Sequence, residues 1–266
     1  MSNQVAIERA APPAIPMTVY SIMSVTILLV IWAIVTNTGL VGPGYLPTPQ
    51  AMGQQLVALV EKGYGGKPLW DHIEASLFRA LAGFFIGVLT GVPFGLFSGY
   101  HKAVGAMMSP VMAFIRPIPP IAFIPMAVLY FGLGETGKVV LIVFTAFNYS
   151  FVSAQAGAMS VPMSYYRAAE SIGLTKFQIF WRIVFPSSIP QVFTGLKVAM
   201  ALSWAVVVAA ELVGAQKGLG FMISDAAQLF QIPVVFIGIA LIGLIGLVLN
   251  FALSITEEKI VHWKGR

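Results

Sequence analysis

The sequence predicts an all-α membrane protein with about six transmembrane helices. Of its 266 residues, 58% are hydrophobic and only 9% are charged, whereas roughly a quarter of the residues are charged in ordinary globular domains. Long stretches carry no charge, and about 20 predominantly apolar residues suffice to span a bilayer. The few cations also concentrate on one side of the expected spans, which is typical of multi-pass membrane proteins.

Uncharged stretches place the spans. Four stretches contain no Asp, Glu, Lys or Arg, and they cover residues 10–60, 80–101, 139–166 and 226–256. Two more, 103–134 and 198–216, carry one charge each, Arg116 and Glu211. We therefore expect spans at 17–36, 76–99, 108–133, 139–160, 191–214 and 232–255. Residues 17–255 then form a single transmembrane domain, because no linker or low-complexity run separates a second one.

The first span is expected to remain as a transmembrane helix. Its apolar stretch is longer than that of a signal peptide, and no small-residue cleavage site follows it. Residues 1–16 would then be a cytoplasmic N-terminal tail, and residues 256–266 a cytoplasmic C-terminal tail.

The distribution of lysine and arginine predicts the orientation. With both termini in the cytoplasm, the inner segments hold nine cations, namely Arg9, Lys102, Arg167, Lys176, Arg182, Lys197, Lys259, Lys264 and Arg266. The outer segments hold five, namely Lys62, Lys67, Arg79, Lys138 and Lys217. This excess agrees with the positive-inside rule. The net charge of +5 then reflects topology, and no nucleic-acid partner is indicated.

A short helix is expected between the first two spans. Thr48 can cap it, Pro49 suits its first position, and Gly63 can end it. Met52, Leu56, Leu59 and Val60 recur on one face. We expect this helix to lie on the outer leaflet of the membrane, with a contact between two copies of the chain as the alternative.

The second and third spans carry packing signals of opposite kinds. Gly87 and Gly91 in the second span have the spacing that lets two helices approach closely. The third span contains Pro117, Pro119, Pro120 and Pro125, which cannot support an unbroken hydrogen-bond ladder. Irregular backbone at membrane depth needs protein or water around it, so this span is expected to face the interior of the bundle.

The usual motifs for catalysis and metal binding are missing. Residues 132–139, GLGETGKV, fit the spacing of a phosphate-binding loop, but Val139 stands where Ser or Thr must hold magnesium. The three histidines are too far apart in the sequence for the helical zinc-binding pair, and no nucleophile elbow is present. We therefore expect no enzyme activity, no metal site and no cofactor bound by this chain.

Residues 165–190 interrupt the apolar pattern with two short helices joined at a corner. Gly173 follows the first helix, over 165–172, where a left-handed residue would end it. Thr175 and Gln178 form a capping box that starts the second helix. The second helix is expected to present an apolar face made of Phe177, Phe180, Trp181 and Val184. It is expected to stop at Pro186, and Ser187 and Ser188 can cap the next span. The hairpin fits a docking platform or an amphipathic loop on the inner leaflet.

The same segment resembles the cytoplasmic loop of ABC-importer permeases, which reads E-A-A, three residues, G, nine residues, I, any residue, L, P. The matching positions are Arg167, Ala168, Ala169, Gly173, Ile183, Phe185 and Pro186. Arg167 stands for the glutamate of the motif and Phe185 for its leucine. Glu170 can supply a carboxylate one turn further on.

The resemblance extends over nearly the whole chain. The stretches YLPTP, RPIPPIAFIPMAVLYFGLGE and AAELVGAQKGLGFMI are similar to the branch that imports taurine, alkanesulfonates, nitrate, bicarbonate and related small anions. LWDHIEASLFR, ELVGAQKGLGFMISDAAQLF and IVHWKG most resemble taurine-transporter permeases.

This resemblance implies a type I ABC-importer permease in a bacterial inner (plasma) membrane, and it implies partners. They are a second permease copy, two cytosolic ATPase subunits that bind ATP and magnesium, an external substrate-binding protein and the membrane lipid. The loop would be the coupling helix that docks in the ATPase. Its candidate contact residues are Arg167, Ala168, Ala169, Glu170, Gly173, Thr175, Lys176 and Phe177.

Ionisable groups inside spans are costly and are candidates for the solute pathway. The planar fork of Arg116 suits the oxygens of a sulfonate. Glu211 would meet the ammonium of taurine or pair with Arg116. Alternatively, Arg116 lies at the inner interface. Further candidates are Pro117, Pro119, Asn148, Tyr149, Ser203 and Trp204.

The expected function is thus the import of taurine or a related sulfonate as the permease subunit of an ABC importer. Nitrate, bicarbonate or another small solute such as a cofactor precursor is the alternative within the same machinery. An autonomous secondary transporter is the alternative from another class, but it would be expected to show internal repeats, and none is evident. It would also leave the hairpin of residues 165–190 without a role.

Overall fold

The computed structural model describes residues 16–263. Within that range the chain forms helices and no named strand, in the order α1 (Met17–Asn37), α2 (Pro49–Lys62), α3 (Leu69–Tyr100), α4 (Lys102–Ile115), the 3-10 turn η1 (Pro120–Phe123), α5 (Ile124–Phe131), α6 (Glu135–Met159), α7 (Met163–Ser171), α8 (Lys176–Ile179), the π-helical turn η2 (Phe180–Val184), α9 (Phe185–Glu211), α10 (Leu219–Gln228) and α11 (Ile232–Ile260). Of the predicted tails, residues 1–15 with Arg9, and Lys264 and Arg266, lie outside the described residues.

The predicted spans correspond to long apolar helices. Within residues 16–263, five helical stretches are long and apolar enough to cross a membrane, at α1, α3, α6, α8–α9 and α11. A sixth arises if α4 and η1–α5, which are bent by 81° relative to each other, count as one broken span. Several helices exceed the predicted bounds: α3 begins at Leu69 rather than 76, and α11 continues to Ile260 rather than 255.

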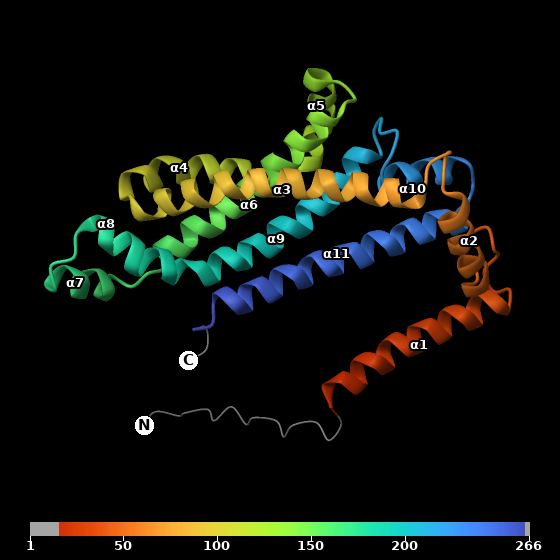
Figure 1. Ribbon diagram of the computed structural model, residues 1–266, viewed down its shortest axis with the longest axis horizontal. Helices are drawn as coiled ribbons and strands as arrows, with labels where there is room; N and C mark the ends of the chain where they lie inside the picture. Colours follow the sequence, from red (N-terminus) through yellow and green to blue (C-terminus); the bar gives the residue numbers. More distant parts are fainter. Residues whose placement is uncertain (1–15, 264–266) are drawn as a thin grey trace, which may run out of the picture.

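The core lies between α3, α6 and α9, which pack along most of their length, with α11 beside α9 (Figure 1). Glycine makes the α3–α6 contact close. A Cβ atom at Gly87 would lie 2.6 Å from the Cβ of Ala146, and one at Gly99 would lie 2.7 Å from the Cβ of Ala158. Real side chains never approach so closely, so the small-residue spacing of the second span acts in helix packing, as predicted.

The third span is broken where its prolines predict it. The α-helix α4 ends at Ile115, and the chain passes Pro117 and Pro119 before η1 begins at Pro120. The expectation that this span faces the interior of the bundle is wrong for the single chain. Met107, Phe114 and Leu129 are each more than 70% exposed, although other parts of the span contact α3, α6 and α9.

α1 stands apart from the bundle (Figure 1), and α2 joins it to the rest. The capping of α2 is as predicted: Thr48 accepts a hydrogen bond from the Ala51 N–H at 3.2 Å, and Gly63 ends the helix with φ 72°. Leu59 is only 1% exposed, but Leu56 and Val60 face outward. The contact of α2 with α11 therefore covers only part of the predicted apolar face.

Candidate functional site

The predicted corner of the hairpin is present, at the end of the molecule opposite α2 and α10 (Figure 1). Gly173 has φ +78°. Its N–H donates to the Glu170 carbonyl at 3.0 Å, and the Leu174 N–H donates to the Ala169 carbonyl at 3.0 Å. This pair of bonds is the Schellman motif that ends a helix on a left-handed residue. Beyond its two chain neighbours, no atom of the described residues lies within 4 Å of the place a Cβ would occupy, so the need for glycine here is one of backbone conformation.

The second helix starts with the predicted capping box. The Gln178 N–H donates to the Thr175 hydroxyl at 3.3 Å, and the Thr175 N–H donates to the Gln178 side-chain oxygen at 2.9 Å. Tyr100 of α3 also donates from its hydroxyl to the Lys176 carbonyl at 2.8 Å, and its ring stacks on Tyr166 of α7. Burial raises the pKa of the Tyr166 hydroxyl. The hairpin is therefore held against the C-terminal end of α3.

The prediction that Pro186 stops the second helix is wrong. α8 continues through η2 into α9, and Ser188 does not cap a new helix but donates to the Val184 carbonyl at 2.6 Å. A proline inside an α-helix removes one hydrogen bond and crowds the carbonyl four residues earlier. Here the wider π-helical turn directly precedes Pro186, and the Phe185 N–H donates to the Phe180 carbonyl five residues back. The turn accommodates the proline without ending the helix.

The exposed surface of the hairpin differs in part from the predicted one. Phe177 is 73% exposed and Trp181 is also exposed, whereas Ile179 and Val184 point into the core. The residues of the predicted apolar face thus divide between the surface and the core. Val184 is buried with Ile179 in a cluster that also contains Leu96 and Ala158. Ala169 is buried in the same core and offers no contact surface. The other coupling candidates are exposed, namely Arg167, Ala168, Glu170, Gly173, Thr175 and Lys176.

Three of the pathway candidates come together in the structure. Arg116, Asn148 and Tyr149 line one small cavity of about 10 Å³, between the break after α4 and the middle of α6. This is close to the smallest volume that holds a water molecule. Arg116 itself is exposed, as are Pro117 and Pro119.

Ser203 and Trp204 are buried in the bundle. Trp204 donates from its indole N–H to the Ile242 carbonyl of α11 at 3.0 Å. The hydroxyl of Ser203 has no hydrogen-bond partner among the residues described. Both side chains therefore belong to the packed core in this conformation.

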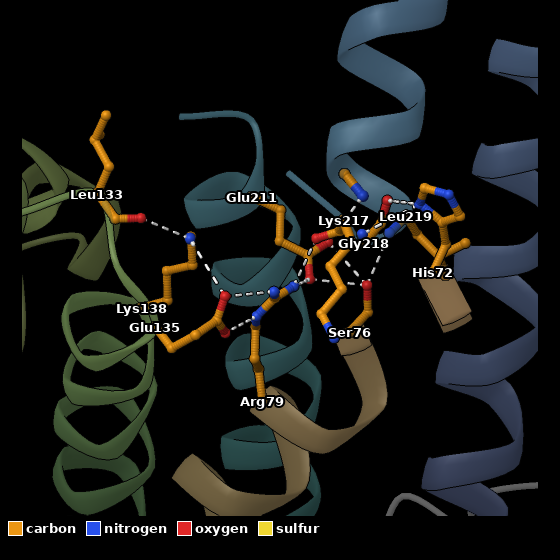
Figure 2. Close-up of polar contacts among 11 residues, drawn as sticks. His72, Ser76, Arg79, Leu133, Glu135, Lys138, Glu211, Lys217, Gly218 and Leu219 are labelled. Carbon is orange, nitrogen blue, oxygen red and sulfur yellow. Dashed lines mark hydrogen bonds and ion pairs between the residues drawn. The ribbon is translucent and has the colours of Figure 1, made fainter. Parts of the chain in front are cut away.

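Glu211 does not reach Arg116, contrary to one of its two predicted roles. It pairs with Arg79 of α3, whose Nη1 donates to the Glu211 Oε1 at 2.6 Å (Figure 2). The Arg79 network also contains Glu135, the first residue of α6, whereas Arg116 lies beside Asn148 of the same helix. These two positions on α6 are about 20 Å apart at 1.5 Å per residue. Distance along the bundle thus separates Glu211 from Arg116.

The Glu211 carboxylate is fully buried and fully bonded. Besides Arg79, it accepts from the Ser76 hydroxyl at 2.8 Å and from the Gly220 N–H at 2.9 Å. Arg79 donates in addition to the Lys217 carbonyl at 2.9 Å. The arginine and the carboxylate together hold the ends of α3 and α9 to the start of α10 (Figure 2).

The sequence interpretation missed Arg79, Glu135 and Lys138, because it assigned the two cations to outer loops. Arg79 is 1% exposed and Lys138 is 6% exposed. A signal was present: Ser76, Arg79 and Gly83 recur at three- and four-residue spacing, which places the arginine on the buried face of α3. No group of metal-binding side chains occurs within the described residues 16–263.

The sequence is similar to those of known transport proteins. Residues 91–262 match the family model described as binding-protein-dependent transport system inner membrane component. The chain is 36% identical to the taurine transport system permease protein TauC of Escherichia coli over 246 residues, 92% of this chain and 90% of that protein. It is 31% identical to the nitrate import permease protein NrtB of Synechocystis over 252 residues, 92% of this chain and 90% of that one.

A solved structure shares the fold. The chain superposes on a chain of the MetNI methionine ABC transporter, captured in an inward-facing conformation, with a TM-score of 0.64 and 17% sequence identity. The superposition covers 72% of this chain and 97% of the other.

Proposed function

Because the chain belongs to the family of inner-membrane components of binding-protein-dependent transport systems, and is thus a permease subunit of an ABC importer and not itself an enzyme, we propose that the solute it carries is taurine or a related sulfonate. The observation that carries this proposal is the 36% identity to a taurine permease over nine-tenths of both chains. Nitrate is the second candidate, favoured by the 31% identity to a nitrate permease.

An ABC-importer permease works with an ATPase and an external binding protein. We propose that the hairpin α7–Gly173–α8 is the surface that docks on the ATPase, with ATP and magnesium bound in that partner. Its support is the exposure of Phe177 and Ile172, which are 73% and 76% accessible, beside the charged side chains of Arg167, Glu170 and Lys176. Large apolar side chains exposed among charges are typical of a protein–protein contact.

A continuous helix behind this surface offers a route by which a movement of the hairpin could reach the opposite end of the bundle. From Lys176 the helix runs through η2 and α9 to Glu211, a stretch of 36 residues, or about 50 Å at 1.5 Å per residue. We propose that closure of the ATPase pair moves α8, and that α9 carries the displacement to the Arg79–Glu211 pair. The spans would then rock between inward-open and outward-open states.

A second copy of the chain completes the proposed importer. α1 and the α4–α5 span leave wide apolar surfaces uncovered, at residues such as Leu28, Phe114 and Leu129. Lipid and a second permease copy would cover these surfaces, with both termini in the cytoplasm. The pathway for the solute would then lie between the two copies, along the broken span that carries Arg116, Pro117 and Pro119.

Reconstitution tests the proposed function. Alone in proteoliposomes, this chain should neither hydrolyse ATP nor accumulate solute. With its partner ATPase and binding protein added, ATP-dependent uptake of taurine is expected, and excess nitrate or bicarbonate should not suppress it. Uptake driven by an ion gradient through the purified chain alone would contradict the ABC mechanism, and uptake of nitrate in preference to taurine would contradict the proposed solute.

Arg116→Gln should slow sulfonate uptake while the complex still assembles. The charge of Arg116 would favour passage of an anionic head group beside Asn148 and Tyr149, and Arg116→Lys should rescue uptake only in part because lysine lacks the planar fork. The measurement is the initial rate of taurine uptake by the full complex. Lys259→Gln, at an exposed position on α11, is the control. A wild-type rate in Arg116→Gln would mean that the side chain has no role in the pathway.

A further inference from the structure

The guanidinium of Arg79 is bonded along two edges by partners of different character. One edge is held inside the protein: Nη1 donates to Glu211 at 2.6 Å and to the Lys217 carbonyl at 2.9 Å, and the side chain of Glu211 is not exposed at all. Because Glu211 neutralises the arginine and is itself bonded by Ser76 and Gly220, this edge keeps Arg79 in place without help from any other group.

The other edge of the guanidinium is occupied by an exposed group. Nε and Nη2 both donate to the carboxylate of Glu135, with 2.7 Å between Nη2 and Oε1. The side chain of Glu135 is 61% exposed. Two parallel N–H···O bonds from an arginine fork require two oxygen atoms at carboxylate-like spacing. A sulfonate presents such a pair of oxygens, so it could take the position of the Glu135 carboxylate.

A second cation, Lys138, lies close enough to pair with Glu135. The Nζ of Lys138 lies 3.8 Å from the Glu135 Oε1 and donates to the Leu133 carbonyl at 2.9 Å (Figure 2). If a sulfonate bonded Arg79, Glu135 would need to move only from one cation to the other. The number of paired charges would stay the same, which avoids the cost of leaving a charge unpaired in a partly buried site.

The surroundings of the Arg79–Glu135 pair suit a zwitterion. An open hollow of about 410 Å³ is lined by Arg79, Glu135 and Lys217 together with the carboxylates of Asp71 and Glu74. A second hollow of about 440 Å³, which Glu135 also lines, is lined by Lys67, Lys138 and Lys217. A small molecule with a sulfonate at one end and an ammonium at the other would find partners of both signs in the first hollow.

We propose that Arg79 is an anion-binding subsite at the end of the bundle opposite the α7–α8 hairpin, that Glu135 occupies it at rest, and that the sulfonate of the incoming solute displaces Glu135 onto Lys138. This inference rests on the proposed function, and it adds a receiving site that is distinct from Arg116. Because α9 ends at Glu211, the subsite lies at the far end of the helix that begins at the hairpin.

The test is direct binding of labelled taurine to the purified permease–ATPase complex in lipid nanodiscs, without the binding protein. Glu135→Gln keeps the size of the side chain and removes the competing charge, so it should bind taurine about tenfold more tightly, the size expected for the loss of one charged hydrogen-bonding competitor. Lys138→Met should bind it more weakly, because the displaced Glu135 loses its second partner. Equal or weaker binding in Glu135→Gln would overturn the proposal.

Two further probes sharpen the result. Methanesulfonate, which has no ammonium, should also bind more tightly to Glu135→Gln, whereas Glu74→Gln should weaken taurine and leave methanesulfonate unchanged. Choline, a cation without an oxyanion, should gain nothing from Glu135→Gln, because the variant loses a negative charge; an equal gain for choline would show that the variant merely opens the hollow to any solute, and would reject the subsite.

The same assay separates the subsite from the proposed solute. If the full importer accumulates taurine but Glu135→Gln binds it no more tightly, the subsite is rejected and the function stands. If the importer carries nitrate instead, the sulfonate solute is rejected, and tighter binding of nitrate by Glu135→Gln would still support an oxyanion site on Arg79.

Discussion

Glu211→Leu is expected to lower the free energy of unfolding of the permease by about 3–5 kcal/mol, the usual cost of removing one member of a buried ion pair. The substitution leaves the buried Nη1 of Arg79 without its carboxylate, and it leaves the Ser76 hydroxyl and the Gly220 N–H without their acceptor. Glu135 still bonds the other edge of Arg79, but it is exposed and cannot replace an acceptor inside the bundle.

Thermal unfolding in detergent, together with the yield of folded protein from membranes, measures this effect. Arg79→Met combined with Glu211→Leu should recover much of the loss, since the buried charge is then gone from both sides. Glu74→Leu, an exposed carboxylate on the same helix, is the matched control and should be close to wild type. If Glu211→Leu unfolds at the wild-type temperature, the pair does not hold the ends of α3 and α9 together.

The features that the sequence predicted correctly are set by local rules. Hydropathy places the spans, and the corner at Gly173 with its capping box at Thr175 depends on residues within one turn of each other. Pro186 shows how a local rule fails: a π-helical turn directly before it lets the helix continue. The proline alone does not predict that α8 continues into α9 through such a turn.

The pairing of Arg79 with Glu211 could not be predicted from local rules. The two residues are 132 positions apart in the sequence, and Arg79 stands only three residues inside the predicted start of its span. An arginine there is usually a flanking charge in the interface, so the charge count assigned it to a loop. The spacing of Ser76, Arg79 and Gly83 indicates which face of α3 carries the arginine, but only the packing of α3 against α6 and α9 brings Glu211 to it.

Gly173→Val is expected to uncouple the importer while the permease stays inserted in the membrane. At φ +78° a β-branched residue is a genuine outlier, and strain of this kind costs of order 1–3 kcal/mol. Since no described atom beyond the two neighbouring residues lies within 4 Å of an added Cβ, the effect is expected to come from the backbone strain. The strain is small beside the packing of a six-span bundle but large enough to change the angle between α7 and α8.

Gly173→Asn should be milder, because asparagine adopts the left-handed region more readily than valine. Ser164→Ala, at an exposed position in α7 with ordinary helical backbone and outside the proposed contact residues, is the matched control and should behave as wild type.

The most direct test of the central claim, that α7–Gly173–α8 couples the permease to its ATPase, is the ratio of taurine transported to ATP hydrolysed in proteoliposomes. It should be measured beside the amount of ATPase that co-purifies with each variant. We expect Gly173→Val to retain less ATPase, or to hydrolyse ATP with little uptake, and Gly173→Asn to fall between it and wild type. Wild-type co-purification and a wild-type transport ratio in Gly173→Val would contradict the assignment of this corner as the coupling element.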